Sequence, residues 1–116
     1  MSYFSLSKQL IIKKLDVFNE LFKKGASLNS NHIMLLFLES DKSRFGFAVS
    51  KKIKGAIKRN RAKRRLREVL RLNQSHLPNN IYLVLVAKPG IERVKFELLN
   101  KEFLNLIKKL NYKVIQ

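Results

Sequence analysis

The spacing of apolar residues along the chain predicts two long amphipathic helices. The first runs from about Ala56 to Asn73, and its apolar residues fall within an arc of roughly 100°: Ala62, Leu66, Val69 and Leu70. The second runs from about Lys95 to Leu110, with one apolar stripe that recurs every third or fourth residue: Leu99, Phe103, Leu106, Ile107 and Leu110. Each helix is therefore expected to bury one side and to expose the other.

A shorter helix is predicted nearer the N-terminus. Asp16 can cap its first turn, Phe18, Leu21 and Phe22 share a side, and Gly25 ends it. The residues before it, 1–14, have no strong period and are predicted to be extended.

Apolar runs predict the strands. Residues 32–39 and 44–50 flank a polar turn of four residues, so the pair is predicted to form a hairpin. Residues 81–87 form a continuous apolar run that is typical of a buried strand. A shorter strand is predicted through Ser27 and Leu28. The order of elements indicates an α+β fold or a split βαβ unit, with a small mixed sheet.

Length and composition favour a single globular domain over residues 1–116. Hydrophobic residues make up 46% of the 116 residues, which is enough for a modest core. Apolar runs such as Ile33–Leu38 are far too short to span a membrane, and residues 1–15 lack the apolar stretch of a signal peptide. We therefore expect a cytoplasmic protein without a membrane partner. The absence of Cys excludes disulfides and thiolate zinc sites.

The net charge of the chain indicates the class of partner. The chain has 25 Lys and Arg against 8 Asp and Glu, a formal net charge of +17, which attracts polyanions. Residues 51–71 hold 11 of these bases and one acid, Glu68. Because one acid cannot pair with 11 bases, a helix face balanced by ion pairs is excluded, and phosphate binding is favoured. A second arc of the long helix carries Asn60, Lys63, Arg64, Arg67 and Arg71, flanked by Lys58, Arg61 and Arg65.

The sequence has no convincing hydrolytic site. His32 and His76 are isolated in the sequence and are interpreted as surface or packing residues, and the acidic residues form no paired motif of a two-metal nuclease. If phosphodiester cleavage is linked to this protein, a partner must hold most of the metal ions.

Several segments carry a resemblance to a known family. Arg59-Asn60-Arg61, continued by Lys63-Arg64 and preceded by residues 49–52, Val-Ser-Lys-Lys, resembles the signature of the bacterial ribonuclease P protein family. Residues 16–25, 44–50 and 81–88 are similar to the family's first helix, to the strand that leads into the basic helix and to the later strand. The resemblance covers about residues 16–110 in the family's order.

The resemblance implies a function and a topology. Ribonuclease P removes the 5′ leader of precursor tRNA, its catalyst is an RNA subunit, and the holoenzyme requires magnesium; the protein alone is expected to be inactive, to bind no cofactor and to need no protein partner. The implied fold is ribosomal-protein-like, with a left-handed βαβ crossover, whereas general rules favour the right hand. Family roles predict contact with the RNA subunit for Arg59, Asn60, Arg61, Lys63, Arg64, Arg67 and Arg71. They predict a leader-binding cleft from Phe18, Phe22, Leu36, Lys51 and Lys52.

Three other classes remain open from the residues alone. A ribosomal protein or another basic protein that binds structured RNA without a linked activity would have the same composition. A nucleoid DNA-binding protein would share the charge, and preference for folded RNA over duplex DNA would exclude it. A protein-only nuclease is disfavoured because paired carboxylates are missing.

Overall fold

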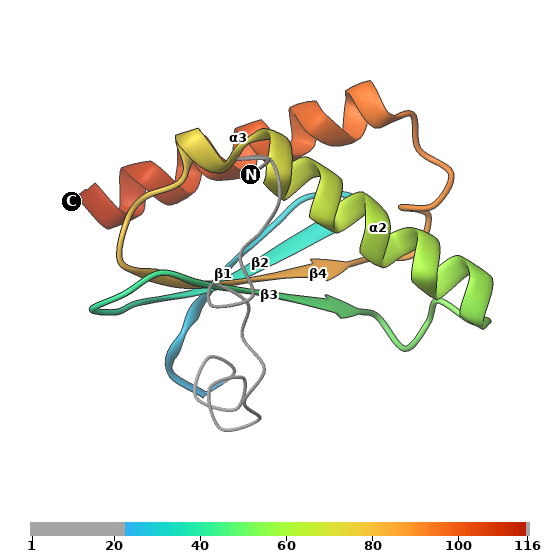
Figure 1. Ribbon diagram of the computed structural model, residues 1–116, viewed down its shortest axis with the longest axis horizontal. Helices are drawn as coiled ribbons and strands as arrows, with labels where there is room; N and C mark the ends of the chain where they lie inside the picture. The colour runs from blue at the N-terminus through green and yellow to red at the C-terminus, as the bar shows by residue number, and fades with distance from the viewer. Residues whose placement is uncertain (1–22, 116) are drawn as a thin grey trace, which may run out of the picture.

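The computed structural model describes residues 23–115 and shows a four-stranded sheet covered on one face by two helices (Figure 1). The strands are β1 (Ala26–Asn29), β2 (Ile33–Glu39), β3 (Arg44–Val49) and β4 (Ile81–Ala87), in the order β1-β2-β4-β3 across the sheet. The pairs β1·β2 and β2·β4 are antiparallel, and β3·β4 is parallel. The predicted α+β fold with a mixed sheet is thus confirmed.

The predicted hairpin of residues 32–39 and 44–50 is wrong. β4 lies between β2 and β3 and pairs with both of them, so its continuous apolar run belongs to a central strand. The turn at residues 40–43 crosses the start of β4 and is tied to it, because Ser40 N donates to Asn80 O at 2.9 Å and Asn80 N donates to Ser43 Oγ at 3.0 Å. The hairpin of the sheet is instead formed by β1 and β2.

The two helices lie where the apolar patterns predicted them. α2 spans Ala56–Leu72, and α3 spans Phe96–Ile115, five residues beyond its predicted end. A short 3-10 turn, η2 (Gln74–His76), follows α2. Asn73, between the two, donates from its side-chain amide to Val69 O and to Asn100 Oδ1, both at 2.7 Å, and so joins the end of α2 to α3. None of the helices in residues 23–115 is long and apolar enough to cross a bilayer.

The main core lies between the helices and the sheet. The predicted apolar residues of both helices are buried there: Ala62, Leu66, Val69, Leu70, Leu99, Phe103, Leu106, Ile107 and Leu110. Alternate residues of the central strands, such as Leu35, Leu83 and Leu85, pack against these helix residues in the same core. Burial at 25–30 cal/mol per Å² makes this core the main source of the fold's stability.

The other face of the sheet is also apolar. Because strand side chains alternate, the remaining strand residues form a second cluster, built around the buried Leu36 and Val84. Met34, Leu38 and Tyr82 are partly buried beside them. The sheet therefore has two chemically similar faces, one of which carries α2 and α3.

Part of the N-terminal prediction lies outside the described residues. The extended segment 1–14 and most of the first predicted helix, with Phe18 and Phe22, are among them. Lys23 and Lys24, at the predicted end of that helix, are helical.

Candidate nucleic-acid interface

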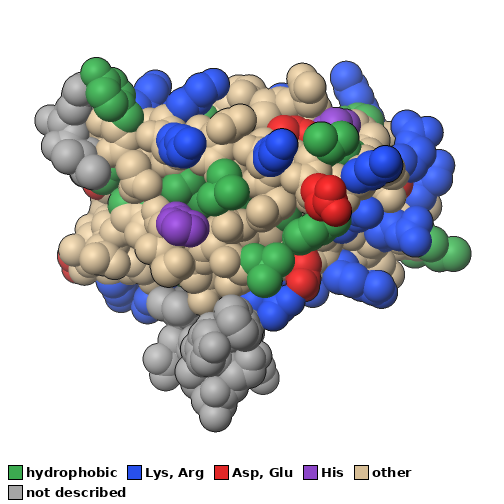
Figure 2. All heavy atoms as spheres, turned by 90° about the horizontal axis from the view of Figure 1, so that it is seen from above, with side chains coloured by type: hydrophobic (Ala, Val, Ile, Leu, Met, Phe, Trp, Pro, Cys, Tyr) green, Lys and Arg blue, Asp and Glu red, His purple; other side chains and the backbone are tan. Residues whose placement is uncertain are grey.

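The outer side of α2 presents a row of exposed cations. Arg61, Lys63, Arg64 and Arg67 are exposed, and Asn60 is exposed among them; we call these four cations the cationic face of α2. Figure 2 shows Lys and Arg side chains gathered at the end of the molecule where α2 begins. Arg71 is half-buried and forms an ion pair with Glu68, so the one acid of this segment is engaged by a base of the same helix.

Arg67 also covers part of the sheet edge. Its guanidinium carbon lies 5.6 Å from the centroid of the Phe47 ring, within the range of a cation–π contact. Phe47 belongs to β3, the edge strand. The cationic face is therefore fixed to the edge of the sheet at this point.

Arg59 points inward, unlike the other basic residues of the signature. Its Nη1 donates to Ser50 O and Ile53 O, both at 2.9 Å, and its Nη2 donates to Val49 O at 3.3 Å. Val49 is the last residue of β3, and Ser50 and Ile53 lie in the connection between β3 and α2, where Ile53 is 4% exposed. The guanidinium of Arg59 thus holds the end of β3 and the connection against the start of the helix. Its predicted contact with RNA stays a prediction.

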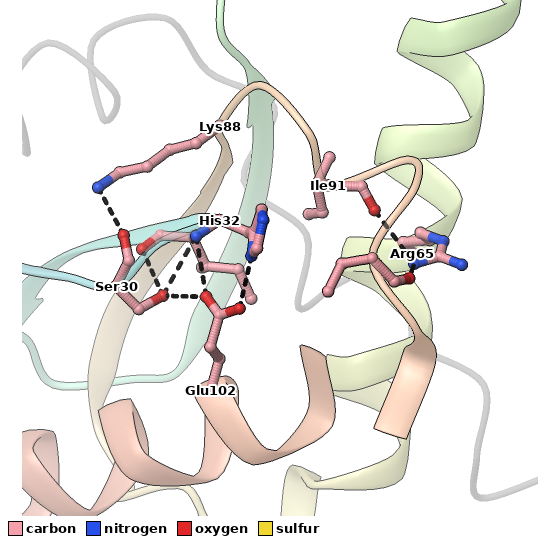
Figure 3. A network of polar contacts seen from close by, with 8 residues as sticks. Ser30, His32, Arg65, Lys88, Ile91 and Glu102 are labelled. Atoms are coloured by element: carbon pink, nitrogen blue, oxygen red, sulfur yellow. Dashed lines mark hydrogen bonds and ion pairs between the residues drawn. The ribbon is translucent and has the colours of Figure 1, made fainter. Parts of the chain in front are cut away.

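Arg65 has a similar role at the other connection. Its Nη1 donates to Ile91 O at 3.1 Å and to Val94 O (Figure 3), both in the segment between β4 and α3. The sequence held a signal for both arginines. Arg59 precedes Ala62 by three residues and Arg65 follows it by three, so both lie beside the buried face of the helix.

The predicted cleft residues lie in two separate places within the described chain. Leu36 is 7% exposed and lies in the second cluster, on the sheet face opposite α2 and α3. Lys51 and Lys52 are exposed in the turn that follows β3. Phe18 and Phe22 lie outside the described residues, so the cleft as a whole stays a prediction.

A polar network joins the β1–β2 turn to α3 (Figure 3). The Glu102 carboxylate accepts hydrogen bonds from Ser30 Oγ at 2.6 Å and from His32 N at 2.8 Å, and its Oε2 lies 2.6 Å from His32 Nδ1. Burial raises the pKa of Glu102, but the hydrogen bonds from His32 and Ser30 outweigh it, so the pKa lies below its ordinary value. Lys88 Nζ donates to Ser30 O at 2.8 Å. His32 is thus a packing residue, as predicted.

His76 is exposed on η2, and its carbonyl accepts a hydrogen bond from the Asn111 side chain at 2.9 Å. Among residues 23–115, no group of three or more His, Asp or Glu side chains lies together as metal ligands would. What the described residues present is a set of exposed cations on α2, a helix that Arg59 and Arg65 tie to neighbouring segments by hydrogen bonds.

Comparison with known proteins shows the family to which the chain belongs. The family model described as Ribonuclease P matches residues 6–111. The chain belongs to the ribonuclease P protein family. It is 35% identical over 101 residues to the ribonuclease P protein component of Pelotomaculum thermopropionicum, covering 85% of this chain and 90% of that protein. It is 36% identical over 106 residues to that of Syntrophomonas wolfei, covering 90% and 89%.

Solved structures of the family share the fold. The RNase P protein of Staphylococcus aureus superposes with a TM-score of 0.75 at 25% identity, covering 87% of this chain and 94% of that chain. That of Thermotoga maritima gives a TM-score of 0.71 at 33% identity, covering 79% and 89%. The resemblance found in the sequence is confirmed. The chain is a protein component of the ribonuclease P ribonucleoprotein, and so acts in tRNA processing together with the RNA of that particle.

Proposed function

We propose that the cationic face of α2 binds the RNA subunit of ribonuclease P, and that a separate surface receives the 5′ leader of precursor tRNA. The observation that carries the proposal is the exposure of Arg61, Lys63, Arg64 and Arg67 on one side of a helix whose one acid, Glu68, is paired with Arg71. Four exposed cations on one helix offer several contacts to the phosphates of a nucleic acid strand, and arginine donates to phosphate in pairs.

The leader site is the finer part of the proposal. We assign it to the sheet face that carries Leu36, together with Phe18, Phe22, Lys51 and Lys52. Aromatic rings bind bases of any sequence by stacking, which suits a leader without a fixed sequence. The apolar second cluster around Leu36 and Val84 supports this assignment because it lies on the face of the sheet away from α2 and α3.

Chemistry is assigned to the RNA in this proposal. The family resemblance implies that the holoenzyme needs magnesium, and we place that ion with the RNA subunit, where it supplies charge stabilisation at the scissile phosphate. The protein contributes binding and orientation. Incubation of the protein with precursor tRNA and magnesium should give no 5′ cleavage until the RNA subunit is added.

The decisive experiment compares two pairs of lysine or arginine substitutions. The double variant Arg61→Ala/Arg64→Ala should bind ribonuclease P RNA more weakly and with a smaller dependence on salt, because two phosphate contacts are lost. The matched control Lys108→Ala/Lys109→Ala removes two exposed cations of α3 and should leave affinity and salt dependence close to those of the wild type. Equal losses in both double variants would mean that binding follows net charge alone.

The leader site has its own test. Phe18→Ala should weaken the binding of precursor tRNA to the assembled enzyme and spare mature tRNA, which has no leader. Each stacked base contributes on the order of 1–3 kcal/mol. A folded variant that keeps the wild-type ratio between precursor and mature tRNA would move the leader site elsewhere.

A further inference from the structure

Ile57 is the most exposed large apolar side chain among residues 23–114. It is 86% exposed, compared with 67% for Tyr112, 53% for Leu98 and 44% for Leu72. Single exposed apolar residues are common on protein surfaces, so exposure alone does not indicate a role. The position of Ile57 and the charges around it distinguish it from the other three.

Ile57 is the second residue of α2, and it lies on the outer side of the helix. It precedes the fully buried Leu66 by nine residues. At 100° per residue this spacing places the two side chains on opposite sides of the helix. It precedes Arg61 by four residues and Arg64 by seven, which places it on the same side as these two. Ile57 thus lies at the N-terminal end of the cationic face.

The start of α2 is held so that Ile57 cannot turn inward. The buried Ile53 and the three carbonyls bound by Arg59 fix the connection that leads into the helix. Gly55, with a φ of 91°, turns the chain directly before the helix. An isoleucine in the first helical turn loses side-chain freedom and caps no backbone group. Neither the fold nor the helix therefore accounts for an isoleucine here.

The surroundings of Ile57 select a nucleic acid as its partner. Besides Arg59, which is turned inward, five exposed cations lie close to it in the sequence: Lys51, Lys52, Lys54, Lys58 and Arg61. No acid occurs between Asp41 and Glu68. A folded RNA offers phosphates beside apolar surfaces, namely the faces of unstacked bases and the carbon edges of riboses. A bilayer would need a larger apolar area than one side chain on the outer side of this helix provides.

We propose that Ile57 is the apolar anchor of the RNA-binding surface: it packs against an unstacked base or a ribose of the RNA subunit while the cations around it bind the flanking phosphates. This inference rests on the proposed function of the cationic face. It adds a contact that does not depend on charge, and such a contact can recognise a particular place in the folded RNA.

The experiment measures the affinity of the full-length protein for ribonuclease P RNA over a range of salt concentrations. Ile57→Ala should weaken binding about tenfold, equivalent to about 1.4 kcal/mol, with an unchanged salt slope, because no phosphate contact is lost. Ile57→Val should retain most of the affinity. Leu98→Ala, which removes an exposed leucine of α3, is the matched control and should bind like the wild type. Melting temperatures should be close to that of the wild type, since the 86% exposed side chain of Ile57 buries little surface.

Ile57→Lys sharpens the test. The added charge should steepen the salt slope, yet affinity at moderate salt should stay below that of the wild type because the apolar contact is gone. Stronger binding by Ile57→Lys, or wild-type affinity for Ile57→Ala, would overturn the inference. So would loss of binding to vesicles of anionic lipid by Ile57→Ala with RNA affinity intact, which would mark a membrane contact. If both Ile57→Ala and Arg61→Ala/Arg64→Ala bind the RNA with wild-type affinity, the proposed function of the cationic face fails as well. If Ile57→Ala binds like the wild type but Arg61→Ala/Arg64→Ala binds weakly, only the inference about Ile57 fails.

Discussion

The two sides of α2 use the same side chain for opposite purposes. Arg59 and Arg65 direct their guanidinium groups to five backbone carbonyls of the connections beside the helix. Arg61 and Arg64 are exposed on the outer side. A guanidinium has five N–H donors and always carries its charge, so it serves equally well for carbonyls inside the fold and for phosphates outside it.

The inward arginines determine where the outward ones lie. Arg59 fixes the connection from β3 into α2, and Arg65 binds α2 to the segment between β4 and α3. The helix is therefore held to two separate segments, the connection that precedes it and the connection between β4 and α3. Counting the bases of residues 51–71 overstates the binding surface, because part of the positive charge holds the support in place.

The largest expected effect comes from removing an inward arginine. Arg59→Ala should lower the free energy of unfolding by about 2 kcal/mol, because hydrogen bonds from a charged group contribute roughly 1.5–3 kcal/mol and the bonds to three carbonyls are lost. Urea unfolding measures it. Arg59→Lys keeps the charge but not the fork of donors, so most of the loss should persist. A fully stable Arg59→Ala protein would contradict the structural role.

The outward arginines should show the reverse behaviour. Arg64→Ala should leave the free energy of unfolding within about 0.5 kcal/mol of the wild type, while the slope of log K against log salt for RNA binding shrinks by about one. Relative to about 1 M salt, that single contact corresponds to about tenfold in affinity at about 0.1 M. If Arg59→Ala and Arg64→Ala lowered the slope equally, the distinction between the two sides would collapse.

Sequence reasoning identified the helix, but it did not predict which of its arginines bind backbone carbonyls and which are exposed. The 3.6-residue period placed Ala62, Leu66, Val69 and Leu70 on the buried side, and all four are fully buried. The same period places Arg59 beside that side, yet the family resemblance predicted that Arg59 contacts the RNA subunit. Which carbonyls come within reach of a guanidinium depends on the path of the neighbouring connections, and no local pattern encodes that path.

Strand order was beyond local patterns for a related reason. Strands that are neighbours in sequence and separated by a short turn usually pair, so residues 32–39 and 44–50 were expected to form a hairpin. The insertion of β4 depends on pairing between residues that are 38 apart for β3 and β4 and 42–54 apart for β2 and β4. The hand of the crossover through α2 is a prediction that only the family resemblance supplied.

The network at Glu102 extends the comparison to a carboxylate directed inward. Because its pKa is lowered in the folded protein, Glu102 contributes stability that is present above the ordinary pKa of about 4.5 and is lost as pH falls through the lower, folded value. Glu102→Gln should cost about 1 kcal/mol at neutral pH. The difference between variant and wild type in thermal unfolding should shrink below about pH 4.5; a difference independent of pH would mean that the charge of Glu102 contributes nothing.

Arg67 is the residue that tests whether the two roles are exclusive, because it is exposed and also lies over Phe47. A cation–π contact at an exposed site contributes about 0.5–1 kcal/mol. A double-mutant cycle with Arg67→Ala and Phe47→Leu should return a coupling free energy of that size in unfolding experiments. Phe47→Leu alone should also weaken RNA binding slightly without changing the salt slope, because Arg67 keeps its charge and loses only the surface that positions it. A coupling of zero together with a slope reduced by about one in Arg67→Ala would assign Arg67 wholly to the outward set.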